Sequence, residues 1–558
     1  MQTYITGMAT SDYLSGALGT LCRQHRLMQP DEDNIMRLPF LIKGELRVPV
    51  PVEPEVIFLA FVDAEREALP GVVPTHVNLG RAQVLREPVI DRETMRNTGE
   101  FLYTVMPVFT PEEVIETDIP ALCKDLYNMP FSRVTELLGD LSQTFSQNRL
   151  LLDYVRDVTV QTAMLPDLWH DMGFEALAMM LDPESAQQMV DRDLCAWGVD
   201  GSRLLDDWVE LEQAKVLPAP VHVIAAQALG GKAPPWETRT PALRAMPTRQ
   251  LHITAGNAPQ IPFISALRAI LTKSAAVVKS PYGATLPGAL LALALVATAP
   301  DHPITRHLSI VYWPGGDGSV EDAFFMPGSF DRIVVWGAPG AVESVKKRAL
   351  FTKVLTFNPR YGVSLIARES LEGDMDSLAS RAVTDSLVAN QKACIASQIH
   401  YVEGDRDRVK AYALALQKAL AAFDRIAPNY VEPHFVGELK RVMRGVLIDG
   451  EWFVNQKNGF WRSGVVVMDR EVPLSAVTMQ RMIIVRRVDD ISRALAHLHP
   501  GVSTVSVSTP SLKNKIRDIA AASGVSNVVD LGHSGTMFPG MSHDGMMVLS
   551  ELVDWKNG

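Results

Sequence analysis

The chain has 558 residues, and at roughly 150 residues per domain this length allows two to four domains. Hydrophobic residues make up 47% and charged residues 21% of the sequence, as in globular proteins with a large core. The formal net charge of −11 argues against a nucleic-acid partner, which would need a basic face. A local basic pocket for a nucleotide or coenzyme remains compatible with this charge.

The four cysteines are Cys22, Cys123, Cys195 and Cys394, which are widely spaced and form no CxxC pair. This spacing predicts neither a disulfide framework nor a metal site. The N-terminus lacks the charged and apolar regions of a signal peptide. The longest apolar run, 286–299, is too short to span a bilayer and predicts a buried helix. We therefore expect a soluble, cytoplasmic protein without a membrane span.

The first half of the chain contains three kinds of segment. Residues 39–62 are β-rich and punctuated by proline, which favours short or edge strands. Residues 118–215 show apolar residues at helical spacing. Residues 230–250 are rich in proline and charge, as in a loop before the next domain.

From residue 250 onward, short Val/Ile-rich runs alternate with helical patterns. Strands are expected at 250–256, 275–279, 307–313, 332–336 and 353–357, with helices at 262–273, 286–297, near 320 and at 340–349. This alternation predicts a parallel sheet covered by helices, with ligands at the carboxyl ends of the strands.

A second α/β region follows the first. Helices are expected at 375–391, 408–423 and 489–498, with strands at 400–404, 481–488 and 501–509. The chain then ends in a short strand-like run and a polar tail. No internal repeat is visible.

Two strand ends in the first α/β region carry polar side chains, although no GxGxxG or GxxxxGK[ST] motif is present. In HITAGNAP (252–259), the Asn257 amide could stabilise an oxyanion, or it could simply cap the next helix. In AAVVKSPYG (275–283), Lys279 and Ser280 could hold a phosphate or ribose hydroxyl. The alternative for Lys279 is a side chain that snorkels from a strand end.

Cys394 lies in the small-residue segment ANQKACIASQ, between a helix and a strand. A thiolate is a strong nucleophile and forms thioesters, whereas many free cysteines are buried and inert. A later polar cluster, His543-Asp544-Gly545, could position a proton donor at the same site, or an acyl group carried by Cys394 as a thioester. Its alternative is a tail loop that docks on the catalytic domain.

Together these segments resemble the aldehyde dehydrogenase superfamily. That resemblance implies an oxyanion role for Asn257, a nucleophilic role for Cys394 and two α/β domains, one for cofactor binding and one for catalysis. It also implies a set of cofactor-binding residues: Thr254, Ala255, Lys279, Ser280, Trp336, Gly337 and Ala338. The helix after Trp336-Gly337-Ala338 could receive the cofactor's pyrophosphate.

One departure from this superfamily concerns water. Members that hydrolyse their acyl-enzyme carry a Glu, and Phe357 stands where that Glu would be. Without a water-activating base, an acyl-cysteine should persist until a thiol or a hydride reaches it. Phe357 therefore favours thioester chemistry over formation of a carboxylate.

The pieces HITAGNAP, YWPGGD, VVWGAP, ACIASQ, SHDGM and LVDW are similar to the fatty-acyl-CoA reductases of bacterial luminescence (LuxC type). This resemblance covers 250–558 well and 118–215 weakly. It implies NADPH-dependent reduction of an acyl-CoA or acyl-protein thioester to an aldehyde through an acyl-cysteine. A partner acyl-protein synthetase and a homo-oligomer are also implied. Two alternatives are a hydrolytic aldehyde dehydrogenase on the same scaffold and a non-reducing acyl-transfer or scaffold subunit.

The sequence divides into four expected units. Residues 1–115 form a β-rich extension, and 116–366 form a helical lead-in with the cofactor-binding α/β domain. Residues 367–515 form the catalytic α/β domain with Cys394, and 516–558 form a tail for packing or oligomerisation.

Overall fold

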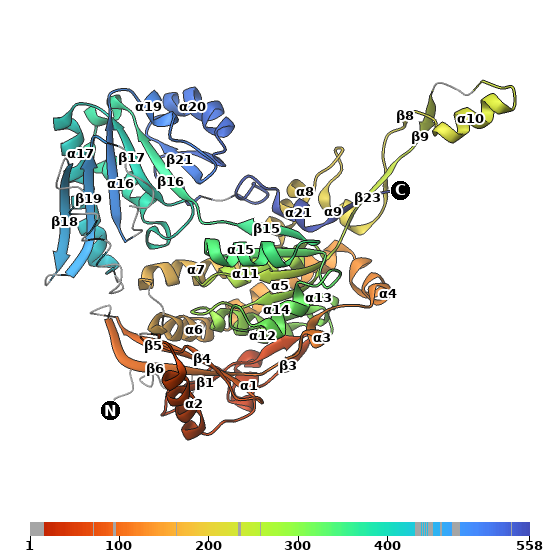
Figure 1. Ribbon diagram of the computed structural model, residues 1–558, viewed down its shortest axis with the longest axis horizontal. Helices are drawn as coiled ribbons and strands as arrows, with labels where there is room; N and C mark the ends of the chain where they lie inside the picture. The colour runs from red at the N-terminus through yellow and green to blue at the C-terminus, as the bar shows by residue number, and fades with distance from the viewer. Residues whose placement is uncertain are drawn as a thin grey trace.

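The computed structural model describes residues 16–558, except for 71, 93–95, 163–164, 233–235, 257, 430–436, 438, 440, 442–443, 445–449, 458–459, 471–479 and 537. Within the described residues, the strands form two seven-stranded sheets, each covered by helices, together with smaller sheets (Figure 1). The predicted α/β class is confirmed.

The first sheet has the order β15-β14-β11-β12-β13-β2-β3, and β11 to β15 run parallel. Its strands are β11 (Arg249–Ile253), β12 (Ala275–Lys279), β13 (Leu308–Val311), β14 (Arg332–Trp336), β15 (Lys353–Phe357), β2 (Phe40–Ile42) and β3 (Glu45–Arg47). The helices that alternate with them are α11 (Ile261–Leu271), α12 (Thr285–Thr298), α13 (Pro303–Arg306), α14 (Gly318–Phe324) and α15 (Pro339–Arg348). The carboxyl ends of the parallel strands therefore share one edge, as the alternation predicts.

Helix α12 coincides with the longest apolar run and is buried along most of its length. It contacts α1 (Gly16–His25) and α5 (Phe131–Gln147) as well as the sheet. Apolar residues on every side suit a helix that is enclosed by protein. No helix in the described part of the chain is both long and apolar enough to cross a bilayer.

The second sheet has the order β18-β19-β20-β17-β16-β21-β22, and only β18 is antiparallel to its neighbour. Its strands are β16 (Tyr361–Ile366), β17 (Ser397–Glu403), β18 (Gly450–Lys457), β19 (Phe460–Met468), β20 (Met482–Val488), β21 (Val502–Val507) and β22 (Asn527–Asp530). The helical segments are η2 (Arg368–Glu372), α16 (Met375–Ser386), η3 (Val388–Gln391), α17 (Arg406–Ile426), α19 (Ser492–Leu495) and α20 (Pro510–Ala522).

The N-terminal segment mixes strands with helix. The strands β1 (Ile35–Arg37), β4 (His76–Asn78), β5 (Gln83–Asp91) and β6 (Arg96–Met106) form a separate sheet in the order β1-β6-β5-β4. The strands expected in the second half of 39–62 were wrong, because Pro54 begins the helix α2 (Pro54–Glu67). Proline fits the first helical turn, where its missing N–H has no intrahelical partner.

The helical pattern between 118 and 215 is confirmed over most of its length. It comprises α4 (Ile119–Leu122), the π-helix η1 (Cys123–Tyr127), α5, α6 (Arg149–Thr162), α7 (Asp167–Met180), α8 (Pro183–Asp193) and α9 (Gly201–Asp206), and α3 (Pro111–Val114) precedes them. These helices pack on the first sheet, where Phe145 of α5 meets Phe263 of α11.

Residues 230–250 are not one loop. They contain β9 (Glu237–Arg239), β10 (Ala242–Met246) and the start of β11. β10 lies between β7 (Val209–Glu210) and β23 (Asp554–Asn557), so its partners are far away in sequence and local composition could not reveal them. β9 pairs with β8 (Ala214–Val216) in an arm that carries α10 (Pro220–Ala228) and projects from the body (Figure 1).

The strand pairing distributes the expected units differently at two points. Residues 361–366 belong to the second sheet, whereas the sequence-based division assigned them to the first domain. β22 also belongs to the second sheet, so the returning tail begins after it. The tail ends in α21 (Val548–Leu552) and β23, which pack on the first sheet's side of the molecule. The division into four units itself stays a prediction.

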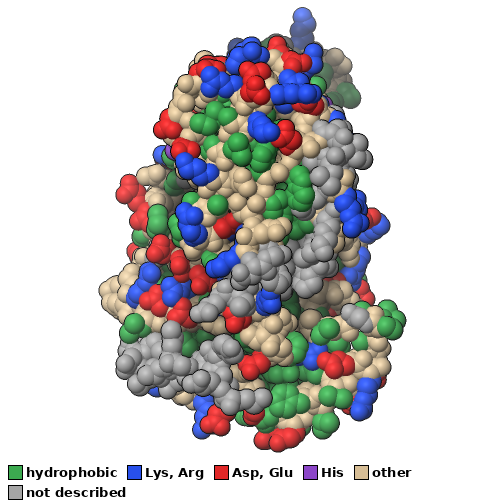
Figure 2. All heavy atoms as spheres, turned by 90° about the vertical axis from the view of Figure 1, so that its left-hand side faces the viewer, with side chains coloured by type: hydrophobic (Ala, Val, Ile, Leu, Met, Phe, Trp, Pro, Cys, Tyr) green, Lys and Arg blue, Asp and Glu red, His purple; other side chains and the backbone are tan. Residues whose placement is uncertain are grey.

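The face of the molecule in Figure 2 shows Lys and Arg side chains interspersed with Asp and Glu. No continuous basic stretch is visible on the described part of that face. This agrees with the acidic net charge, because a phosphate backbone binds to clustered basic side chains.

Candidate active site

The segment that carries Cys394 is a tightly held loop between η3 and β17. Ala389, Asn390 and Gln391 have φ angles of 47°, 58° and 68°, a left-handed conformation that is costly for residues other than glycine. The Gln391 side chain exchanges two hydrogen bonds of 2.9 Å with the backbone of Met482. The strained backbone is thereby fixed just before the nucleophile.

The backbone carbonyl of Cys394 is also fixed. It accepts a 2.6 Å hydrogen bond from the Ser503 hydroxyl, at the start of β21. The thiol itself is partly buried. The sequence contains no local signal for Ser503, because the contact joins two neighbouring strand regions that are more than one hundred residues apart.

The C-terminal tail brings His543 and Asp544 to Cys394. The Cys394 Sγ atom, a His543 ring nitrogen and an Asp544 carboxylate oxygen lie within 4.8 Å of one another. Within the described part of the chain, no other three His, Cys, Asp or Glu side chains bring one such atom each within this distance of one another. The structure thus brings the polar tail cluster next to Cys394, and the roles of its residues stay a prediction.

His543 and Asp544 belong to a tight turn of the C-terminal tail. Asp544 and Gly545 have φ angles of 52° and 79°, and the backbones of His543 and Met546 exchange hydrogen bonds of 2.9 and 3.0 Å. Two successive residues with positive φ define the type I′ geometry for which Asp-Gly is a favoured sequence. The sequence HDGM therefore encodes the turn that presents both side chains.

The pKa values of the three side chains are all shifted from their ordinary values. Burial, followed by the nearby Asp544 charge, raises the pKa of the Cys394 thiol to about 11. Burial also raises the pKa of Asp544, despite the Arg360 and Arg268 charges. Burial, Arg268 and Arg360 lower the pKa of His543 to about 3. At neutral pH the site therefore holds a neutral thiol and a neutral imidazole.

Arg268 of α11 also contacts His543. Its Nη2 donates a 2.8 Å hydrogen bond to His543 Nδ1. Its guanidinium also lies over the rings of Trp336 and Phe357, at 5.2 and 4.9 Å from their centroids. Sequence reasoning missed Arg268; the available signal was a lone arginine within the apolar run that forms a buried helix.

Phe357 is buried at the end of β15 and fills its position with hydrocarbon. Its ring stacks on Trp336 at 3.9 Å between centroids and lies 4.8 Å from the His543 ring. An aromatic ring cannot accept a proton from water. The geometry thus links the carboxyl ends of β14 and β15 to the nucleophile through His543.

The expected cofactor residues share the carboxyl edge of the first sheet. Thr254 follows β11 and its hydroxyl donates to the Lys279 carbonyl, while Lys279 ends β12. Ala255 and Ser280 follow them directly along the chain. Because β11 and β12 are adjacent parallel strands, the four residues are neighbours in space.

Lys279 is a buried cation that forms no ion pair within the described residues. Burial lowers its pKa to about 8, and Glu321 opposes this shift. Its Nζ lies 5.4 and 5.2 Å from the ring centroids of Tyr312 and Trp313. A buried ammonium without a carboxylate partner suits a phosphate or ribose hydroxyl of a nucleotide.

Trp336, Gly337 and Ala338 connect β14 to α15. Ala338 is the N-cap of this helix of ten residues, and its side chain leaves the first N–H groups uncapped. A side chain at Gly340 would meet no atom within 4 Å, so the helix start is open to a ligand. The arrangement suits a pyrophosphate.

The N-terminal segment also reaches this edge. The Glu87 carboxylate, on β5, accepts a 3.1 Å hydrogen bond from the backbone N–H of Gly283, in the loop after Lys279. Burial raises the pKa of Glu87 to about 7. Sequence analysis assigned no role to residues 1–115; this contact shows that they support the loop beyond Ser280.

Asn257 lies outside the described residues, so its oxyanion role stays a prediction. Its neighbour Gly256 is constrained, because a side chain there would lie 2.2 Å from the Tyr282 carbonyl oxygen. Close approach of these two loops requires glycine. The other three cysteines belong to other parts of the fold: Cys22 on α1, Cys123 on η1 and Cys195 after α8.

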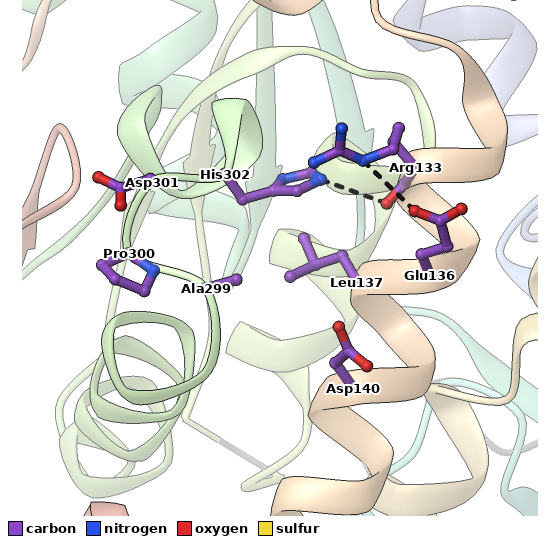
Figure 3. Close-up of a pocket in the computed structure, with 8 residues that line it drawn as sticks. All are labelled: Arg133, Glu136, Leu137, Asp140, Ala299, Pro300, Asp301 and His302. Carbon is purple, nitrogen blue, oxygen red and sulfur yellow. Dashed lines mark hydrogen bonds and ion pairs between the residues drawn. The ribbon is translucent and has the colours of Figure 1, made fainter.

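A surface pocket of about 290 Å³ lies elsewhere, between α5 and the α12–α13 connection (Figure 3). Its His302 is engaged at both ring nitrogens, with Nδ1 accepting from Ile304 and Nε2 bonded to the Arg133 carbonyl. None of the residues at the Cys394 site lines this pocket. It therefore contributes nothing to the chemistry of that site.

Solved structures with the same arrangement define the class of fold. Aldehyde dehydrogenase 21 from Physcomitrella patens superposes with a TM-score of 0.62 at 14% identity, over 86% of this chain and 95% of that one. Aldehyde dehydrogenase C from Pseudomonas syringae, solved with NAD⁺ and octanal, also gives 0.62, at 13% identity, over 93% and 96% of the two chains. The chain has an aldehyde dehydrogenase-like fold.

The family model for acyl-CoA reductase (LuxC) matches residues 237–555, and the chain belongs to this family. The long-chain acyl-protein thioester reductase of Photorhabdus laumondii is 28% identical over 327 residues, which are 56% of this chain and 64% of that protein. The Vibrio harveyi protein of the same name is 27% identical over 326 residues, again 56% and 64%. The match thus spans slightly less than two thirds of these relatives' length.

Proposed function

We propose that this chain reduces an acyl thioester to the aldehyde with NADPH, through an acyl thioester on Cys394. The observation that carries the proposal is the grouping of Cys394, His543 and Asp544 next to Phe357. It combines a nucleophile with proton-handling groups and provides no water-activating carboxylate at the position of Phe357. Family membership and the names of the relatives support the same reaction.

The first half of the reaction transfers the acyl group to Cys394. The thiol loses its proton to a neighbouring group, and the thiolate attacks the acyl carbon. The Asn257 amide and a backbone N–H near Cys394 hold the tetrahedral oxyanion. The thiol of CoA or of an acyl-carrying protein then leaves, and the acyl group remains on Cys394.

The residues at the carboxyl edge of the first sheet would hold the cofactor. Lys279 and Ser280 suit a ribose or its 2′-phosphate, Thr254 and Ala255 line the adjacent strand end, and Trp336-Gly337-Ala338 open onto α15. A bound NADPH would supply hydride. Collapse of the resulting thiohemiacetal releases the aldehyde and regenerates Cys394.

Phe357 decides between the two products that this scaffold can yield. The water-activating base of a hydrolytic aldehyde dehydrogenase would stand at position 357, and the stacked Phe357–Trp336 pair offers no base there. We therefore propose that hydride resolves the acyl-cysteine, which favours the aldehyde-forming reductase over its hydrolytic alternative.

The proposed substrate class follows from the names of the two relatives, which specify a long-chain acyl group on a protein. We propose acyl-protein or acyl-CoA thioesters as donors and an acyl-protein synthetase as the partner that provides them. A non-reducing scaffold role is the alternative, and an activity assay distinguishes it from the reductase.

We also propose a homo-oligomer assembled through the β8–α10–β9 arm. The arm exposes apolar side chains: Leu217 is 72% and Leu229 is 88% exposed, and Val221 and Ile224 are exposed beside them. Exposed apolar side chains on a projecting element are typical of an association surface. The molar mass by light scattering, compared with that of a Val221→Asp/Ile224→Asp variant, tests this point.

The experiment that tests the function is NADPH oxidation by the purified protein with a series of acyl-CoA and acyl-protein thioesters. We expect oxidation with formation of an equal amount of aldehyde for at least one chain length. Carboxylate as the product would favour the hydrolytic alternative. No oxidation across the series, with or without the synthetase, would favour the scaffold.

A further inference from the structure

We propose that Arg268 locks His543 in its neutral Nε2–H form, so that His543 serves as a hydrogen-bond donor at the Cys394 site and Asp544 is the group that accepts the thiol proton. This proposal rests on the proposed function, since it divides the proton handling of that reaction between two residues. It reverses the assignment that a cysteine–histidine pair would suggest. Arg268 is a positioning residue, because it acts through His543.

The hydrogen bond from Arg268 determines which ring nitrogen of His543 carries the proton. An arginine guanidinium carries only N–H donors, so His543 Nδ1 must accept the 2.8 Å hydrogen bond from Arg268 Nη2. In a neutral imidazole the other nitrogen, Nε2, then carries the proton. A ring in that state donates from Nε2 and has no free lone pair for the thiol proton.

The surroundings of His543 oppose its protonation from several sides. Arg268 approaches from α11 and Arg360 from the connection between β15 and β16, where its Nε lies 3.9 Å from an Asp544 oxygen. The aromatic rings of Trp336 and Phe357 cover the imidazole. The negative groups nearby are Asp544 itself and Asp193, whose charge acts on Arg268. Two cations and two rings therefore keep the imidazole neutral.

Arg268 is held in place independently of the nucleophile. It belongs to the buried helix α11, and its guanidinium lies over Phe357 and Trp336. Its Nη1 is buried and has no hydrogen-bond partner in the structure. The hydrogen bond to His543 is thus the specific polar contact through which this buried cation acts on the site.

Asp544 is the remaining proton acceptor close to Cys394. Its carboxylate belongs to the same cluster within 4.8 Å, and its side chain is almost fully buried. In this scheme the proton passes from Cys394 Sγ to Asp544, the thiolate bonds to the acyl carbon, and the bond from that carbon to the departing sulfur breaks. Asp544 returns the proton to the departing thiolate. His543 neither gains nor loses a proton, and its Nε2–H stabilises the developing negative charge.

The first test replaces His543 with residues that separate donor from base. Glutamine places an amide N–H at about the distance of Nε2 but cannot accept the thiol proton. We expect His543→Gln to acylate within about 10-fold of wild type, and His543→Ala to fall by about 100-fold. His533→Gln, on an exposed histidine, is the matched control. Equal loss in the Gln and Ala variants would overturn the donor assignment.

The second test reads the tautomer directly. Nitrogen-15 NMR of labelled histidines, with the His543 signals assigned by their absence from His543→Gln, should show protonated Nε2 and bare Nδ1 from pH 5.5 to 8. In Arg268→Met the ring should titrate with a pKa raised toward its ordinary value, and the acylation rate should gain a new acidic limb. That limb should vanish in Arg268→Met/His543→Gln. A protonated Nδ1 in the wild type would contradict the proposal.

The third test addresses the proton acceptor. Asp544→Asn should slow acylation of Cys394 by at least about 100-fold, whereas exposed Asp518→Asn should leave it unchanged. An Asp544→Asn variant that acylates at the wild-type rate would overturn the second half of the proposal. The NMR result distinguishes this proposal from the proposed function, because the tautomer can be measured even if no acyl thioester is ever reduced.

Discussion

The cofactor edge and the reaction centre are constructed in opposite ways. The cofactor edge consists of the ends of three strands that are adjacent in one parallel sheet, β14, β11 and β12, within fewer than one hundred residues of chain. The reaction centre gathers Arg268, Cys394 and His543-Asp544 from three distant segments. The cofactor edge depends on the local alternation of strands and helices along the sequence. The reaction centre depends on how the C-terminal tail folds back from the second sheet to the first.

This difference has an energetic consequence. Substitutions at the cofactor edge should change one ligand contact and leave the sheet intact, because its strands are held by an apolar core. Substitutions at the reaction centre should also displace neighbouring side chains, since residues from distant segments position one another there.

Loss of the nucleophile should have the largest effect. Cys394→Ala should abolish labelling of the protein by a radioactive acyl thioester, because no other group at the site can form the thioester. Cys195→Ala, on an exposed cysteine, is the matched control and should label normally. Labelling retained in Cys394→Ala would place the nucleophile elsewhere and remove the reaction centre described here.

The oxyanion donor comes next. Asn257→Ala should slow single-turnover acylation by about 100-fold, since one missing donor costs about 3 kcal/mol of barrier. Asn78→Ala, at the exposed end of β4, should have no effect. A rate within a factor of two of the wild type would rule out the oxyanion role of Asn257 and separate the strand edge from the chemistry.

Lys279 tests the cofactor edge by itself. Lys279→Met should raise the KM for NADPH by about 10-fold or more with a smaller change in kcat, because the lost ammonium contacts the bound cofactor and not the acyl group. Lys347→Met on the exposed face of α15 is the control. Affinity for NADPH should also weaken as pH rises through about 8, where Lys279 loses its proton in the free protein.

The smallest effect concerns the return of the tail. The buried Asp193 carboxylate accepts hydrogen bonds of 3.0 and 3.1 Å from the backbone N–H groups of Leu549 and Ser550. Asp193→Asn should destabilise this junction by about 1–3 kcal/mol and lower the melting temperature by a few degrees. Asp200→Asn, at an N-cap without a side-chain bond, should not. An unchanged melting temperature would show that the other contacts of the tail, such as the pairing of β23 with β10, are sufficient to hold it.

The fold was likewise easier to predict where the local sequence determines it than where distant segments meet. β12 and β15 matched their predicted limits because a buried parallel strand is a short apolar run with visible ends. The predictions for residues 54–62 and 237–246 were wrong for different reasons: Pro54 begins a helix, whereas β10 pairs with β7 and β23, which are distant in sequence. No local pattern contains such long-range pairing.

The residues of the site also differed in how readily the sequence predicted them. Cys394, Lys279 and Phe357 could be picked out because each follows or ends a recognisable element. His543 was visible only as a polar cluster, and the sequence could not show which segment it would meet. Arg268 was missed because an arginine within an apolar helix is read as a boundary or an exposed position, and only the folded contacts reveal its role beside His543.

The central claim is that hydride, and not water, resolves the acyl-cysteine. The most direct measurement is intact-protein mass spectrometry of the enzyme after acylation without NADPH, followed over time and then after NADPH is added. The acyl adduct on Cys394 should persist for many turnover times without NADPH and should disappear with an equal yield of aldehyde once NADPH is present. Rapid loss of the adduct to carboxylate before NADPH is added would contradict the claim.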